Sequence, residues 1–223
     1  MKSEYFLIFD FDSTVIQLES LEEIAGFALQ DKDNKDEILK EIGIITDLGM
    51  EGKIDFKESL KKRLALFNIH QNHIDLSNQK ILQNITLFFL KNIEFIRENA
   101  EKIYIISGGF FSNILPVAKR LGISPSHIMS NKFIFDSQNN VCGIDESSPL
   151  LLPQGKSQAV SSLKLDGKII IIGDGYTDYQ IKENGACKYF ISFCENVRRE
   201  NVIKKSDFSA DNLDEAIRII SKL

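Results

Sequence analysis

The sequence has no hydrophobic run long enough to cross a membrane. Its strongest apolar stretches, "ITLFFL" at 85–90 and "KIIIIG" at 168–173, fall far short of the roughly 20 residues that a membrane-spanning helix needs. The first apolar stretch, residues 5–11, is too short for a secretory signal with its cleavage site, and Asp10 interrupts it. We therefore expect a cytoplasmic protein that does not insert into membranes.

Cysteine and histidine are also scarce. The three cysteines, at 142, 187 and 194, show no C-x-x-C spacing, which argues against a zinc site and against a disulfide framework. His70 and His73 lie three residues apart with no third metal ligand near them in the sequence, so we expect them in a solvated loop.

An excess of positive charge is missing as well. The formal net charge is -5, from 27 Lys and Arg against 32 Asp and Glu, so the chain carries no general footprint for nucleic acid. With 223 residues, 43% of them hydrophobic, it can bury one good core and carry a smaller insertion. A monomer and a homodimer are equally compatible with these numbers.

Four short apolar runs are present, and they indicate β-strands. They occupy residues 5–9, 102–106, 168–172 and 188–193. Because such runs alternate with helical patterns, we expect an α/β fold, doubly wound, with a mostly parallel sheet covered on both faces. A small β-hairpin is also expected where "NNVCG" follows "KFIFD".

The stretch from 18 to 85 contains no strand-like run and reads as helical. A capping box at Ser20–Glu23 predicts one helix start, and a second helix is expected over 56–67. The prediction is therefore an α/β core of residues 1–17 and 86–223, with a small all-helical cap, residues 18–85, inserted after the first strand.

Acidic residues gather where the predicted strands end. Asp10 and Asp12 close the first strand, and "GDGYTD" closes the third with Asp174 and Asp178. Ligands of open α/β sheets bind at this edge. Two carboxylates about 4 Å apart repel by roughly 4 kcal/mol at a dielectric of about 20, so a cation is expected between them. An all-oxygen ligand set favours Mg²⁺ over zinc.

A phosphate site is expected beside these acids. "SGGF" at 107–110 follows the second strand, and its free N–H groups, at Gly108 for example, would suit a phosphate together with the Ser107 hydroxyl. Lys156 begins another predicted helix and could add a positive charge. Taken singly, these features are typical of turns and helix starts, and Thr177 with Gln180 forms a plausible capping box.

Taken together and in order, "DFDST", "SGG", Lys156 and "GDGYTD" resemble the haloacid dehalogenase superfamily of phosphotransferases. The resemblance implies a Mg²⁺-dependent phosphatase that acts on a phosphomonoester. In it, Asp10 attacks phosphorus and Asp12 acts as acid and then as base, while Lys156, Ser107 and Gly108 hold the phosphate. The metal would be held by this set: Asp10, Asp12, Asp174 and Asp178.

Arg63 is the unusual residue of the predicted cap. On a helical wheel it lies about 20° from Phe56, within an apolar stripe. Two interpretations are open: the stem packs while the guanidinium reaches water, or the guanidinium binds a carboxylate. Glu19 is similarly open, because an acid near a helix start is favourable without any ligand.

"DFDSTVIQLES" and "MEGKIDFKESLKKR" are similar to the phosphoserine phosphatase family. This resemblance implies that Glu19 meets the substrate amine, that Arg63 meets its carboxylate, and that Met50 and Phe56 shield the site. Thr177 would also face the substrate, with its role open, because many members differ at positions 176 and 177. Two alternatives remain: a capped phosphatase for another small metabolite, such as phosphoethanolamine or an enol phosphate, and a non-catalytic Mg²⁺ and phosphate sensor.

Overall fold

The computed structural model describes residues 5–223, and a six-stranded parallel sheet forms its centre. The strand order is β3-β2-β1-β6-β7-β8, with β1 (Tyr5–Phe9) paired to β2 (Ile103–Phe110) on one side and to β6 (Lys168–Gly173) on the other. The outer strands are β3 (Ile128–Asn131), β7 (Tyr189–Phe193) and β8 (Phe208–Ala210). The predicted α/β class is confirmed, and β3 and β8 add to the four predicted strands.

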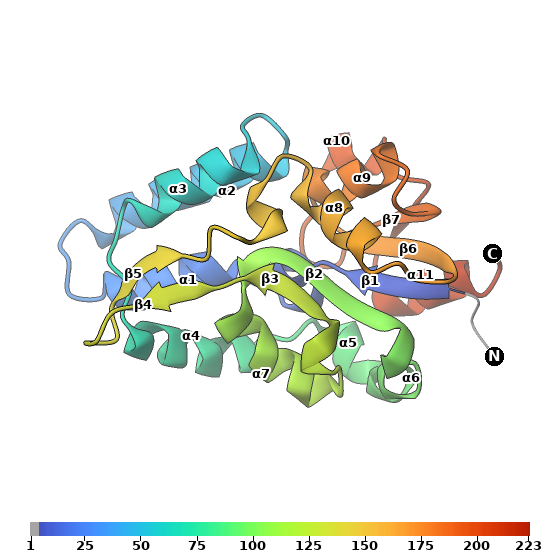
Figure 1. Ribbon diagram of the computed structural model, residues 1–223, viewed down its shortest axis with the longest axis horizontal. Helices are drawn as coiled ribbons and strands as arrows, with labels where there is room; N and C mark the ends of the chain where they lie inside the picture. The colour runs from blue at the N-terminus through green and yellow to red at the C-terminus, as the bar shows by residue number, and fades with distance from the viewer. Residues whose placement is uncertain (1–4) are drawn as a thin grey trace.

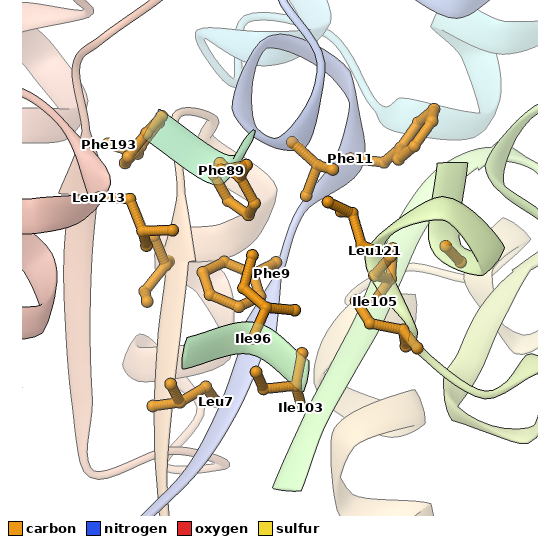
Figure 2. Close-up of a cluster of buried hydrophobic side chains, with 14 of the residues drawn as sticks. Leu7, Phe9, Phe11, Phe89, Ile96, Ile103, Ile105, Leu121, Phe193 and Leu213 are labelled. Carbon is orange, nitrogen blue, oxygen red and sulfur yellow. The ribbon is translucent and has the colours of Figure 1, made fainter. Parts of the chain in front are cut away.

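Alternating side chains of β1 supply two hydrophobic cores, one on each face of the sheet. Leu7 and Phe9 enter the first core and Ile8 enters the second. Figure 2 shows the first core around Phe9, whose ring meets Phe89 edge-on at 5.0 Å between centroids. Helices α5 (Leu87–Lys91), α6 (Ile93–Glu98), α7 (Phe111–Leu121) and α11 (Leu213–Ile220) contribute to it.

The opposite face is covered by α8 (Gly155–Ser162), α9 (Tyr176–Glu183) and α10 (Glu200–Ile203), which bury a second cluster against the sheet (Figure 1). The sheet is therefore doubly wound, as expected. Among residues 5–223, no helix is both long and apolar enough to cross a bilayer.

Four helices fill the chain between β1 and β2 before α5 begins. They are α1 (Ser20–Ala28), α2 (Lys35–Met50), α3 (Phe56–Leu64) and α4 (Gln71–Gln83), and an antiparallel bridge between Ile16 and Ile85 joins the two ends of this insertion. They bury a cluster of their own. The predicted hairpin is present as β4 (Phe133–Phe135) and β5 (Val141–Ile144), and it packs against that cluster.

Several helix starts differ from the sequence predictions because local side chains find other partners. The N-cap of α1 is Glu19, and Ser20 is the first helical residue, with its hydroxyl bound to Asp12. Helix α9 is capped at Gly175, whose N–H donates to Asp178. The histidines are ordered rather than in a solvated loop: His70 caps α4, and its own N–H donates to the His73 ring at 3.1 Å. Helix α3 also ends three residues early, at Leu64.

Candidate active site

The end of β1 and the turn that follows place Asp10 and Asp12 in different surroundings. Asp10 Oδ1 accepts the N–H of Phe11 at 2.7 Å, and the Asp10 N–H continues the sheet by donating to Ile172 at 3.0 Å. The turn at residues 11–15 needs a left-handed residue, Ser13 at φ 53°. Asp12 then accepts two bonds from Ser20, from its N–H at 2.9 Å and from its hydroxyl at 3.0 Å.

Three buried carboxylates converge beside this turn. Asp10, Asp174 at the end of β6 and Asp178 in the first turn of α9 each offer an oxygen atom, and these oxygens lie within 4.8 Å of one another. Burial, with the nearby charge of Asp10 as the next cause, raises the pKa of Asp174 to about 7 and that of Asp178 to about 8. Three hard oxygen ligands in a buried cluster fit a divalent cation. Asp12 stands outside this group.

Lys156 is the cation that lies between these acids. Its Nζ is 2.7 Å from Asp178 Oδ1 and 2.9 Å from Asp10 Oδ1, and the side chain is buried. Burial alone would lower the pKa of Lys156, but the charges of Asp10 and Asp178 outweigh it and raise the pKa. Lys156 therefore stays charged beside Asp10.

The "SGG" segment is held in place by partly buried hydrogen bonds. Ser107 Oγ accepts the N–H of Gly109 at 3.0 Å, and the Gly108 carbonyl accepts from the Asn131 side chain at 2.7 Å. The segment belongs to the irregular end of β2, whose register with β3 shifts before Phe110. A Cβ at Gly108 would overlap the Phe56 ring, so glycine allows the ring to approach the backbone closely here.

A single pocket unites residues of the core and of the helical insertion. Core side chains and cap side chains predicted for the site line it together; they are Asp10, Asp12, Glu19, Met50, Phe56, Arg63, Ser107, Gly108, Lys156 and Thr177. Asp174 and Asp178 are not part of this lining, and they lie behind Asp10 at the acidic cluster.

Arg63 is buried rather than reaching water, with 7% of its surface exposed. Its Nε donates to the Ser59 carbonyl at 3.4 Å and one terminal nitrogen donates to the Thr46 hydroxyl at 3.3 Å. It makes no salt bridge with any residue in the range 5–223. Burial lowers the pKa of Arg63, although the carboxylate of Glu19 opposes this. A buried guanidinium with two long, neutral bonds is suited to an added anion.

Glu19 faces the same pocket from the start of α1. Its Oε1 accepts the Ser13 hydroxyl at 2.7 Å. Burial raises the pKa of Glu19 to about 8, with the charge of Asp12 as the next cause. Burial likewise raises the pKa of Asp12 to about 7, with the charge of Asp10 adding to it. A cationic ligand group near Glu19 and Asp12 would relieve this accumulation of negative charge.

Arg199 is a site residue that the sequence predictions missed. Its Nε donates to Asp174 Oδ2 at 3.1 Å, and a terminal nitrogen donates to Asp47 Oδ1, in α2, at 2.9 Å. It follows β7 at the carboxyl edge of the sheet. The rule that pointed to Asp174 could therefore have pointed to Arg199 as well.

Comparison with known proteins identifies the enzyme superfamily to which this chain belongs. Residues 7–182 match the family model of haloacid dehalogenase-like hydrolases, and the chain belongs to this family. The chain is 30% identical to human phosphoserine phosphatase over 201 residues, which cover 87% of this chain and 83% of that protein. It is also 30% identical to the chloroplastic phosphoserine phosphatase of Arabidopsis thaliana, covering 90% of this chain and 66% of the plant protein. Within the superfamily, the chain belongs to the phosphoserine phosphatase family.

Solved structures agree with this placement. A phosphoserine phosphohydrolase-like protein from Francisella tularensis superposes with a TM-score of 0.89 at 35% identity, covering 97% of this chain and 99% of that chain. A substrate-bound phosphoserine phosphatase complex superposes with a TM-score of 0.78 at 22% identity, covering 98% of this chain, a likeness of fold.

Proposed function

We propose that this protein is a cytoplasmic, Mg²⁺-dependent phosphoserine phosphatase, which releases serine and phosphate from O-phosphoserine in the last step of serine synthesis. One observation carries the proposal: buried Arg63 has no carboxylate partner among the described residues and lines the same pocket as Asp10 and Asp12. A guanidinium binds a carboxylate by a pair of parallel hydrogen bonds. Glu19, on the same pocket, supplies the acid for the substrate amine.

The chemistry follows from the surroundings of the two aspartates. A carboxylate oxygen of Asp10 attacks phosphorus, and an aspartyl phosphate forms as the bond between phosphorus and the serine oxygen breaks. Asp12 donates its proton to that leaving oxygen. In the second step, Asp12 takes a proton from water as the water oxygen attacks phosphorus, which releases phosphate and restores Asp10. A pKa raised to about 7 suits Asp12 to both roles.

The other groups of the pocket hold the phosphoryl group and the metal. Lys156, with Ser107 and Gly108, would meet the phosphoryl oxygens. Mg²⁺ would be held by Asp10, Asp174 and a backbone carbonyl near Asp12, with Asp178 behind them; when bound, it would neutralise charge on the phosphoryl oxygens. Met50, Phe56 and Thr177 line the same pocket. Met50 and Phe56 would shield the amino-acid part of the substrate, and Thr177 would face it.

Substitution of Arg63 tests the substrate assignment. Truncating one partner of a buried charge pair costs about 2 to 5 kcal/mol, and each 1.4 kcal/mol is about tenfold in rate. Arg63→Ala should therefore lower kcat/KM for phosphoserine by roughly 30-fold to 4,000-fold. It should scarcely change the slow hydrolysis of p-nitrophenyl phosphate, which has no carboxylate. Arg63→Lys should restore only part of the loss, because an ammonium cannot form the paired bonds.

Lys62 offers a matched control on the same helix. It is exposed and forms a 2.7 Å surface ion pair with Glu58. Lys62→Ala should therefore leave kcat/KM for both phosphoserine and p-nitrophenyl phosphate unchanged. Phosphoethanolamine, which lacks the carboxylate, and 3-phosphoglycerate, which lacks the amine, should both be poor substrates. If Arg63→Ala lowers the activity on phosphoserine and on p-nitrophenyl phosphate equally, Arg63 supports the structure of the cap. The assignment of Arg63 to the substrate carboxylate is then wrong.

A further inference from the structure

The last turn of α2 and the residues after it contact the core through residues that were not predicted to take part in catalysis or substrate binding. Asp47 Oδ1 is 2.9 Å from a terminal nitrogen of Arg199, and the Glu51 carbonyl accepts from the Asn201 side chain at 3.4 Å. Both partners belong to the segment around the start of α10, 150 or more positions away in the sequence. The insertion is thus held to the core by polar contacts of its own.

Packing reinforces these contacts. Gly52 has φ +74°, and a Cβ there would lie 2.5 Å from the Tyr176 ring. A Cβ at Gly175 would lie 3.2 Å from the Met50 methyl group. Met50 itself lines the pocket with Arg63. The segment 47–52 therefore docks on the core and covers the pocket at the same time.

Arg199 connects this docking to the acidic cluster. Its side chain is 8% exposed, and its Nε is bound to the buried Asp174 at 3.1 Å, whereas the Asp47 side chain on the other arm is 66% exposed. The Asp174 arm anchors the guanidinium within the core. The Asp47 arm joins this anchored guanidinium to an exposed carboxylate of the insertion.

We propose that Asp47 and Arg199 form an ionic latch that favours closure of the helical cap over bound substrate, and that Arg199 is a positioning residue that links closure to Asp174. The part of this inference that concerns phosphoserine rests on the proposed function; the closure itself does not. An ion pair whose carboxylate is exposed shifts an equilibrium by about two- to fivefold, and salt weakens it. The latch therefore adjusts closure without locking it.

Asp47→Asn tests the latch, with Asp211→Asn as its matched control. Asp211 pairs with Arg198 at 3.0 Å and is 70% exposed, so each variant neutralises an exposed aspartate that pairs with one of two neighbouring arginines. Asp47→Asn should raise KM for phosphoserine about two- to fivefold at low salt with kcat retained. At about 1 M KCl, where the Debye length is about 3 Å, the difference from the parent protein should vanish. Asp211→Asn should change neither quantity.

Hydrogen exchange supplies a readout that needs no substrate. In the protein without ligand, amide exchange over segment 47–55 should be faster in Asp47→Asn than in Asp211→Asn. Arg199→Gln should raise the exchange rate of this segment as much as Asp47→Asn does. The double variant should exchange no faster than either single variant. Because Arg199 also holds Asp174, Arg199→Gln should lower turnover of both phosphoserine and p-nitrophenyl phosphate.

The outcomes separate the latch from the proposed function. Faster exchange over 47–55, with phosphoserine rejected as a substrate, would support the latch and refute the substrate. If the exchange rate and the KM of Asp47→Asn match those of the Asp211→Asn control, the latch proposal is wrong. It is also wrong if the effects of Asp47→Asn and Arg199→Gln on exchange add in the double variant.

Discussion

At the scale of single residues, the aspartates Asp10 and Asp12, two positions apart in the sequence, have different neighbours. Asp10 accepts the Phe11 N–H and lies 2.9 Å from the Lys156 ammonium, whose positive charge lowers the repulsion toward an approaching phosphate. Among residues 5–223, Asp12 has only Ser20 as a hydrogen-bond partner, and burial raises its pKa to about 7. One environment suits a nucleophile, and the other suits a proton carrier.

Replacement of Asp10 tests the nucleophile. Asp10→Asn should leave the fold intact and lower turnover by several orders of magnitude, because a carboxamide is a poor nucleophile. Acid quenching of the parent protein during turnover, followed by borohydride trapping and peptide mapping, should locate the modification at Asp10. A fully active Asp10→Asn protein, or a label at another residue, would contradict the proposed intermediate.

Residues at strand ends were predictable from the sequence, and residues brought in by tertiary contacts were not. Asp10 and Asp174 follow apolar runs, so a rule about sheet edges is enough to group them. The wheel position of Arg63 raised the question of its charge, but only the structure shows that it is buried without an ion-pair partner among residues 5–223. Asp47 meets Arg199 across 152 positions, and no local pattern encodes that pairing.

At the scale of helices and strands, long patterns were predictable and short ones were not. Strands β3 and β8 have only four and three residues, "IMSN" and "FSA", and their mixed polarity gives no clear period. The predicted capping residue Ser20 does form a side-chain hydrogen bond, but its hydroxyl donates to Asp12 rather than capping its own helix. Competition from tertiary hydrogen bonds is the physical reason for such errors.

Two glycines in helices should respond oppositely to alanine. Gly122 ends α7 at φ 84°, a left-handed conformation that an added Cβ strains, so Gly122→Ala should destabilise the protein by about 1 kcal/mol or more. Gly26 lies within α1, and a Cβ there would meet nothing within 4 Å. Gly26→Ala should stabilise by about 0.5 to 1 kcal/mol. Urea unfolding measures both, and a shift of the same sign in the two variants would contradict this argument.

At the scale of the whole molecule, the pocket lies where the helical insertion meets the α/β core. The sheet has a core on each face, and the insertion buries a third cluster. Phe110 at the end of β2 belongs to that third cluster and stacks on Phe133 at 3.5 Å. The helical insertion is thereby seated directly above the strand end that carries Ser107 and Gly108. Under the proposed function, the groups assigned to phosphate and those assigned to the amino acid would approach one substrate from the core and from the insertion.

The buried acids of this pocket and of the adjoining acidic cluster should make stability depend on pH and metal. Burial raises the pKa values of Asp12 and Asp174 to about 7 and those of Glu19 and Asp178 to about 8, well above their ordinary values near 4. Between about pH 4 and pH 8 the folded state therefore binds more protons than the unfolded state, and stability falls as pH rises through this window.

Thermal unfolding in excess chelator should accordingly show a Tm that declines from pH 5 to pH 8. Mg²⁺ should raise the Tm more at pH 8 than at pH 5, because its carboxylate ligands must be deprotonated to bind it. Asp174→Asn removes one buried charge and one ligand, so it should lessen both the decline in chelator and the response to Mg²⁺. The same chelator should abolish phosphatase activity, and Mg²⁺ should restore it. A metal-free Tm that rises steadily from pH 5 to pH 8 would mean that these carboxylates are already compensated within the protein, and that no cation is needed to hold them together.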